Sequence, residues 1–230
     1  MIIALLLSIM SVGLLAQDNI PYKRNFDAYS KYILEKNGIE CIEPDNLIDL
    51  QEYFVVQPIR DDRHVGWIYG PVFQSVDGNC VIQYPAFTSP LDVSGKLDYE
   101  SNSLSYKSQI IREIKAALGF PDYVIPSQKS GDSEQRIVSV EYDSTSIDFN
   151  SYVTTIVGKD TKELFNGDTI YIYDVPLKKP FKEKYIYCTG FVIARHGRAS
   201  MNFKIFFTPE GKLEKRRYLD YLKKKIWYID

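Results

Sequence analysis

The sequence RDDRH at residues 60–64 brings two carboxylates and an imidazole close together along the chain. In such a group, Asp61 or Asp62 can orient the ring of His64 so that the ring acts as a general base. That chemistry also needs a nucleophile or a metal from elsewhere, and the sequence shows no residue in that role. We therefore interpret this stretch as a polar loop that enters a β-strand.

The second of the 2 histidines, His196, lies in the sequence ARHGRAS. Arg195 and Arg198 flank it, and neighbouring cations disfavour the charged form of an imidazole. We expect His196 to be an exposed turn residue, and we predict no catalytic residue in this chain.

The 3 cysteines are too few for a disulfide-rich scaffold. Cys41, Cys80 and Cys188 are expected to be small buried apolar residues. One disulfide with a leftover thiol is the alternative, and a catalytic thiol is least favoured. Cys80 and His64 fall at opposite ends of a predicted hairpin, so no Cys–His dyad is expected.

Motifs for metals, cofactors and serine nucleophiles are missing. The sequence has no zinc-ligand spacing, calcium loop, phosphate loop or dinucleotide fingerprint. We predict no metal and no cofactor. With 30 acidic residues, some pair of carboxylates lies within reach in any fold, and such pairs hydrolyse glycosidic bonds. A carboxylate-based cell-envelope hydrolase, with a cleft beside a long polar loop at residues 88–105, therefore remains the alternative function.

Charge is distributed unevenly along the chain. Residues 178–225 hold 14 Lys or Arg against 4 Asp or Glu, whereas the remainder holds 14 basic and 26 acidic residues. This pattern predicts either a patch for an anionic partner or ion pairs with the acidic part of the same molecule, and the second is favoured. The candidate binding residues are Arg195, Arg198, Arg216 and Arg217.

Four tyrosines occupy alternate positions of two predicted strands. Tyr171 and Tyr173 share one face, and Tyr185 and Tyr187 share a face of the following strand. Paired strands would place the four rings in a ladder. We expect the ladder to pack beneath a helix, and the alternative is that it stacks against sugar rings.

The first 15 residues, MIIALLLSIMSVGLL, are nearly all apolar. Because a membrane-spanning helix needs about 20 apolar residues, this shorter run predicts a signal peptide at residues 1–16, cleaved after Ala16. An uncleaved anchor is the alternative. We expect an exported protein, periplasmic or extracellular, with no membrane span after cleavage and no nucleic-acid partner.

Residues 17–230 are expected to form a single α+β domain. The 18 tyrosines and 12 phenylalanines favour sheets, and Asp77-Gly78 is a strong hairpin signal. Since strands follow one another as hairpins, we predict an antiparallel sheet built from hairpins with helices packed on one face. Helices are predicted at 25–38, 105–121 and 208–228, and strands at 52–58, 64–73, 80–87, 136–143, 168–176, 184–195 and 200–209.

These observations favour a non-catalytic binding module over an enzyme, although the residues leave catalysis open. The expected partner is an anionic envelope component or a protein.

Overall fold

The computed structural model describes residues 25–53, 55–58, 66–86, 106–120, 122–125, 139–142 and 147–230. The predicted signal peptide at residues 1–16, the group formed by Asp61, Asp62 and His64, and the predicted loop at 88–105 lie outside these residues.

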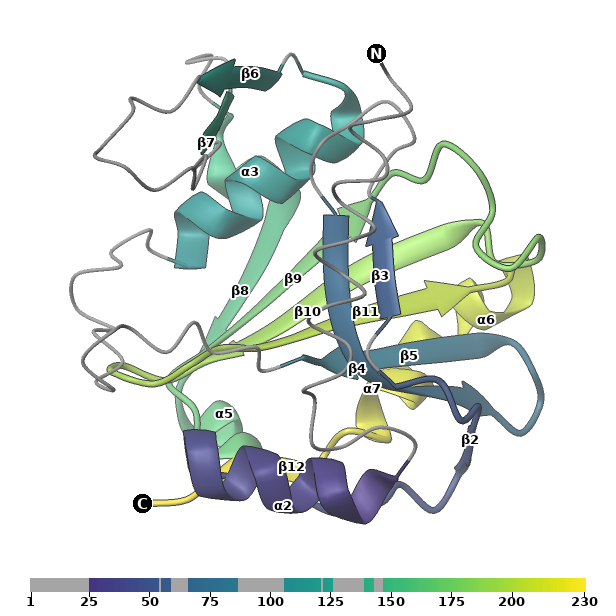
Figure 1. Cartoon of the computed structure of the whole chain (residues 1–230), viewed down its shortest axis with the longest axis vertical. Helices are drawn as coiled ribbons and strands as arrows, with labels where there is room; N and C mark the ends of the chain where they lie inside the picture. Colours follow the sequence, from purple (N-terminus) through teal and green to yellow (C-terminus); the bar gives the residue numbers. More distant parts are fainter. Residues whose placement is uncertain are drawn as a thin grey trace, which may run out of the picture.

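An eight-stranded antiparallel sheet forms the centre of the molecule (Figure 1). Its strand order is β2-β4-β5-β11-β10-β9-β8, and β3 also pairs with β4. The strands are β2 (Leu47–Asp49), β3 (Val55–Pro58), β4 (Gly66–Ser75), β5 (Cys80–Pro85), β8 (Val153–Val157), β9 (Thr169–Val175), β10 (Tyr187–Ala194) and β11 (Met201–Phe207).

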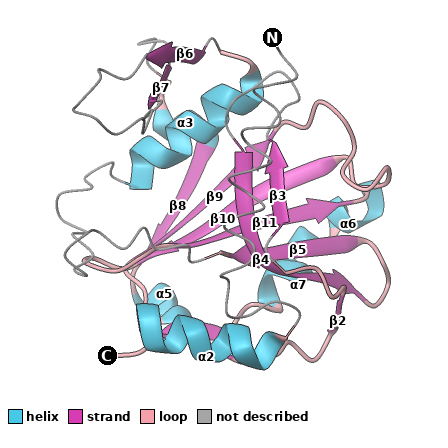
Figure 2. Cartoon of the chain, in the orientation of Figure 1, coloured by secondary structure: helices cyan, strands magenta, loops and turns pink. Residues whose placement is uncertain are grey.

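Two smaller antiparallel sheets and several helices surround this sheet (Figure 2). The smaller sheets pair β1 (Ile39–Cys41) with β12 (Ile226–Tyr228) and β6 (Asp122–Ile125) with β7 (Ser139–Tyr142). The helices are α2 (Phe26–Asn37), α3 (Tyr106–Leu118), α4 (Phe149–Tyr152), α5 (Lys159–Phe165), α6 (Pro209–Leu213) and α7 (Lys215–Asp220).

Hairpins build the sheet, as the turn chemistry predicted. Between β4 and β5, Gly78 adopts a φ of 69°, in the left-handed region that favours glycine. Ser75 Oγ accepts a hydrogen bond from the Cys80 N–H at 2.9 Å across this turn. The α+β class and the antiparallel sheet are therefore confirmed.

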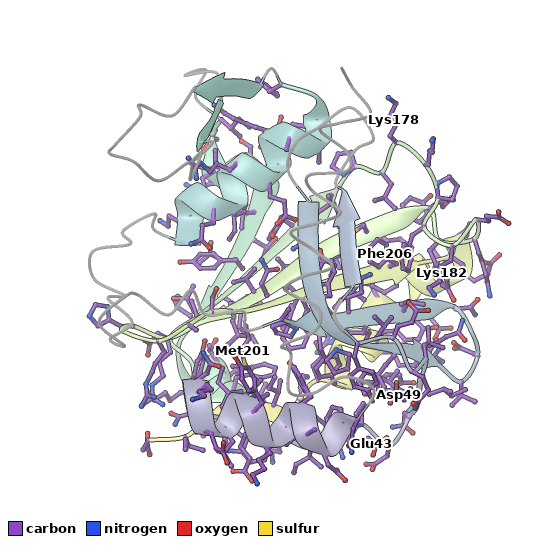
Figure 3. The ribbon with its side chains drawn as sticks, viewed as in Figure 1. Glu43, Asp49, Lys178, Lys182, Met201 and Phe206 are labelled. Carbon is purple, nitrogen blue, oxygen red and sulfur yellow. The ribbon has the colours of Figure 1, made fainter. Side chains whose placement is uncertain are left out.

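Alternating side chains give the sheet two buried faces. On one face, Tyr29 and Ile33 of α2 pack with Phe73 and Phe203, and Met201 points into the space between α2 and the sheet (Figure 3). On the opposite face, buried residues of α3 pack with buried residues of β9, β10 and β11. Helices α2 and α3 therefore cover opposite faces of the sheet, whereas helices packed on one face were predicted from the sequence.

The predicted C-terminal helix at 208–228 is wrong beyond Asp220. The chain turns, with Lys224 at a φ of 56°, and then forms β12. Ile226 and Tyr228 are fully buried, and the Tyr228 hydroxyl donates to the Ile193 carbonyl at 3.0 Å. A β-branched and aromatic run favours a strand when it can pair, and β1 supplies the partner.

Candidate binding surface

The four arginines singled out from the sequence do not form one patch. Arg195 and Arg198 lie in the turn before β11, whereas Arg216 and Arg217 lie in α7 beyond its other end. A seven-residue strand spans roughly 23 Å. The structure therefore places these residues as two separate pairs.

Arg195 and Arg198 lie beside the C-terminal strand. The Arg195 guanidinium donates to the Asp230 carboxylate at 3.0 Å and to the Ile229 carbonyl at 3.2 Å. Hydrogen bonds from Asn166 and Arg195 lower the pKa of Asp230. Arg198 packs over Gly38, where an added Cβ would lie 2.7 Å from Arg198 Nη1. Both side chains are thus engaged within the molecule.

Arg217 is also neutralised internally. It pairs with Asp77, contacts Glu214 at 2.7 Å and lies 4.6 Å from the centroid of the Tyr218 ring. Burial alone would raise the pKa of Asp77, but hydrogen bonds from Ser75, the backbone of Asn79, Tyr218 and Arg217 lower it to about 2. Arg216 is exposed on the same helix.

Lysines of the basic segment (residues 178–225) are also paired with acidic residues of the same chain. Lys212 and Lys215 both contact Asp174, at 2.8 and 3.1 Å. Lys225 pairs with Asp45 at 2.7 Å, and Lys182 pairs with Glu52. The basic segment thus binds acidic residues of the same chain, as the favoured interpretation of the charge pattern predicted.

Exposed apolar side chains gather at the end of the sheet where the β4–β5 turn lies. Leu213 is 88% exposed and Val76 is 73% exposed, although both are large hydrophobic residues. Ile186 and Tyr187, at the start of β10, are 44% and 40% exposed. We call these residues the apolar end surface: Val76, Ile186, Tyr187 and Leu213.

Specific contacts bring the three segments of this surface together. The close approach of α6 to the β4–β5 turn requires glycine, because a Cβ on Gly211 would lie 2.2 Å from the Asn79 carbonyl oxygen. Lys184 donates to the Gly78 carbonyl at 2.7 Å, from the segment before β10. The Lys212 ammonium lies 5.6 Å from the Tyr187 ring centroid. The turn, α6 and the start of β10 therefore meet at the right-hand edge of the molecule in Figure 1.

The sequence did not predict the apolar end surface, because hydrophobic periodicity identifies the buried faces of helices and strands and not exposed apolar residues in turns. A signal was present, since Val76 stands in a polar turn (SVDGN) and Leu213 stands between charged residues (GKLEK). Neither pattern shows that the two segments meet.

A buried polar cluster, also missed, connects α3 to the sheet. Lys204 of β11 is fully buried, and its ammonium contacts Glu113 of α3 at 3.0 Å. It also donates to Tyr173 at 3.3 Å and to Asn202 at 2.7 Å. The Tyr173 hydroxyl donates to Glu113 at 3.1 Å.

A mid-strand glycine makes room for this cluster. Tyr173 lies opposite Gly190, where an added Cβ would be 2.2 Å from the tyrosine ring. Burial and the charge of Glu113 raise the pKa of Tyr173 well above its ordinary value, so the hydroxyl remains a donor. Each of the four polar side chains contacts at least one other member of the cluster, which indicates a structural role.

The predicted tyrosine ladder does not form, because Tyr171 and Tyr173 pair with Val192 and Gly190 rather than with tyrosines. Tyr171, Tyr173 and Tyr185 are buried, and Tyr187 alone is exposed. The prediction of packing is confirmed for the three buried rings.

The described thiols and imidazole lie in different environments. The three cysteines are free and buried, and burial raises the pKa of each thiol, which confirms the prediction of buried thiols over a disulfide. His196 is an exposed turn residue, as expected, and its backbone N–H donates to Asp168 at 2.7 Å.

One shallow hollow of about 280 Å³ lies between α5 and β12. Among its described lining residues, Glu163 is the one carboxylate, and it lies 3.4 Å from Lys159. The hollow therefore lacks the pair of carboxylates that sugar hydrolysis needs. It is lined by Lys162, Glu163, Leu164, Asn166, Lys224 and Trp227.

Comparison with protein-family models, curated proteins and solved structures found no match. Across the described ranges, no group of three His, Cys, Asp or Glu side chains could hold a metal ion. None of the helices in those ranges has the length and apolar character needed to cross a bilayer. Function is therefore inferred from the residues and their geometry.

Proposed function

We propose that this protein is an exported, non-catalytic binding module whose apolar end surface docks a protein partner. The observation that carries the proposal is the exposure of Leu213, Val76 and Tyr187 on three segments that meet at one end of the sheet. Exposed apolar side chains that gather in one place, with arginine nearby, are typical of protein interfaces.

A protein fits this surface better than an anionic envelope component does. The cations around it are already paired, Arg217 with Asp77 and both Lys212 and Lys215 with Asp174. An anionic ligand would have to displace these carboxylates, whereas an apolar contact leaves the ion pairs intact.

The alternative, a carboxylate-based hydrolase, has less support. Its general acid needs a raised pKa, yet among the described carboxyl groups the resolved pKa shifts, at Asp77, Asp174 and Asp230, are downward. These carboxylates are ion-paired and so remain charged at neutral pH.

Capture of partners from envelope extract tests the proposal. The immobilised wild-type protein is compared with a Val76→Asp/Leu213→Asp variant. A Leu34→Asp variant is the matched control, because Leu34 is also an exposed leucine, at 39%, but lies on α2 and not on the apolar end surface. It precedes Gly38 by one helical turn, and Arg198 packs over Gly38. We expect a defined protein to be captured by the wild type and the control and lost by the double variant.

A further variant distinguishes a protein partner from an anionic partner. The exposed Arg216 is replaced in Arg216→Glu, which reverses one charge and leaves the apolar residues in place. Loss of the partner from Arg216→Glu, with full retention by Val76→Asp/Leu213→Asp, would contradict the proposal and favour an anionic component. Equal recovery of all partners by every variant would contradict both.

A further inference from the structure

Strand β8 ends the order of the large sheet, and its own sequence has none of the residues that usually protect an edge. Its sequence is VTTIV, without charge or proline, and residues 154–157 are exposed. Ile156 is 37% exposed and Val157 is 67% exposed. Edge strands in native proteins are ordinarily protected by charged residues, proline or bulges, because an open edge is a template for another strand.

The backbone of β8 shows which groups face outward. Val153 opposes Tyr173 of β9, but the Val153 N–H donates to the Phe149 carbonyl of α4. That N–H therefore points away from β9. Because the hydrogen-bonding direction alternates along an antiparallel strand, Thr155 and Val157 also direct their N–H and C=O groups outward.

We propose that β8 pairs with β8 of a second copy of this chain, antiparallel, with Thr155 on a two-fold axis. Thr155 then exchanges both backbone hydrogen bonds with Thr155 of the second copy. The Val157 N–H donates to the Val153 carbonyl of the second copy, and the symmetric bond forms on the other side.

The side chains of β8 are self-complementary in this register. Thr155 opposes itself, Thr154 opposes Ile156, and Val153 opposes Val157. Paired threonines and β-branched residues stabilise neighbouring strands, and no charge is repeated across the axis. A two-fold interface needs a surface that complements itself in this way, which an arbitrary peptide partner does not require.

The association is expected to be weak and reversible. A single pair of five-residue strands buries less than the roughly 1,200 Å² of a standard interface. The apolar end surface lies at a different part of the molecule, so self-pairing through β8 goes beyond the proposed function. A negative result for the apolar end surface would leave the β8 proposal unaffected.

Cysteine cross-linking of the full chain tests the register. Residues that exchange both hydrogen bonds have Cα atoms about 5.5 Å apart, within the range of a disulfide. We expect Thr155→Cys to form a disulfide-linked dimer on mild oxidation. The native cysteines are buried and do not compete.

Val157→Cys is the matched control. In the proposed register, the two copies of residue 157 are offset by four positions, or about 14 Å, too far for a disulfide. Equal cross-linking of both variants, or of neither, would overturn the proposal.

Sedimentation supplies an independent measurement. The wild-type mass is expected to rise with concentration, whereas Thr155→Lys is expected to remain monomeric because it places two ammonium groups on the axis. A wild type that stays monomeric at every concentration, or a Thr155→Lys variant that self-associates as the wild type does, would overturn the proposal. Circular dichroism checks that each variant is folded.

Discussion

Removal of Lys204 should destabilise the fold strongly, because its ammonium is buried with Glu113. In Lys204→Met, the Glu113 carboxylate loses a cation at 3.0 Å and keeps the Tyr173 hydroxyl at 3.1 Å. Removing one partner of a buried ion pair costs about 3–5 kcal/mol. We expect the free energy of unfolding to fall by that amount, and Glu113→Gln to produce a comparable fall.

The double variant should be less damaging than the two single changes together. Lys204→Met/Glu113→Gln removes both charges, and the amide still accepts from Tyr173. Since replacing a whole buried pair is often near neutral, we expect a loss below about 2 kcal/mol. The coupling energy should therefore be about 4 kcal/mol or more in favour of the pair.

Urea unfolding followed by fluorescence and circular dichroism measures all four proteins. Lys204→Glu/Glu113→Lys, which reverses the pair, controls for the mere presence of charge. Single variants that cost less than about 1 kcal/mol, or a double variant equal to the sum of the singles, would refute the role assigned to this cluster.

Other expected outcomes follow from the same geometry. Gly190→Ala should lower the free energy of unfolding by about 1–3 kcal/mol, measured in urea, because its Cβ would lie 2.2 Å from the Tyr173 ring. The pKa of Asp77 is about 2 in the fold, below the ordinary value near 3.9, so its contribution to stability is present above about pH 4 and is lost as the pH falls toward 2. Acid titration of Asp77→Asn should show a shallower loss over that interval, and an unchanged titration would contradict the assignment. Thiol reagents should label no cysteine in the native protein and all of them in denaturant, namely Cys41, Cys80 and Cys188.

Much of the fold could be predicted because local chemistry specified it. Asp77-Gly78 selects a tight turn, and alternation in residues 187–194 and 201–207 gives two long strands. The predicted C-terminal helix extends too far because the many Lys, Arg and Glu residues in this segment favour a helix along its whole length. Pairing with β1, almost the whole chain away, decided the conformation of Ile226–Tyr228.

The surface and the buried cluster depended on contacts that sequence spacing does not encode. A lysine within the apolar run MNFKIFF is a visible anomaly, but its partner Glu113 lies on a helix 91 residues earlier. The arginines were grouped because they are near in sequence, yet β11 holds the two pairs apart. Charge composition alone likewise cannot show that acidic residues elsewhere neutralise Lys212 and Lys215.

Site-specific photo-cross-linking in living cells tests the proposed docking surface most directly. A photoreactive amino acid is placed at Leu213, which is 88% exposed, and separately at Leu34 on α2. We predict one defined protein adduct from position 213 and none of that mass from position 34. The same adducts from both positions, or no adduct from position 213, would contradict a protein-binding role for this end of the sheet.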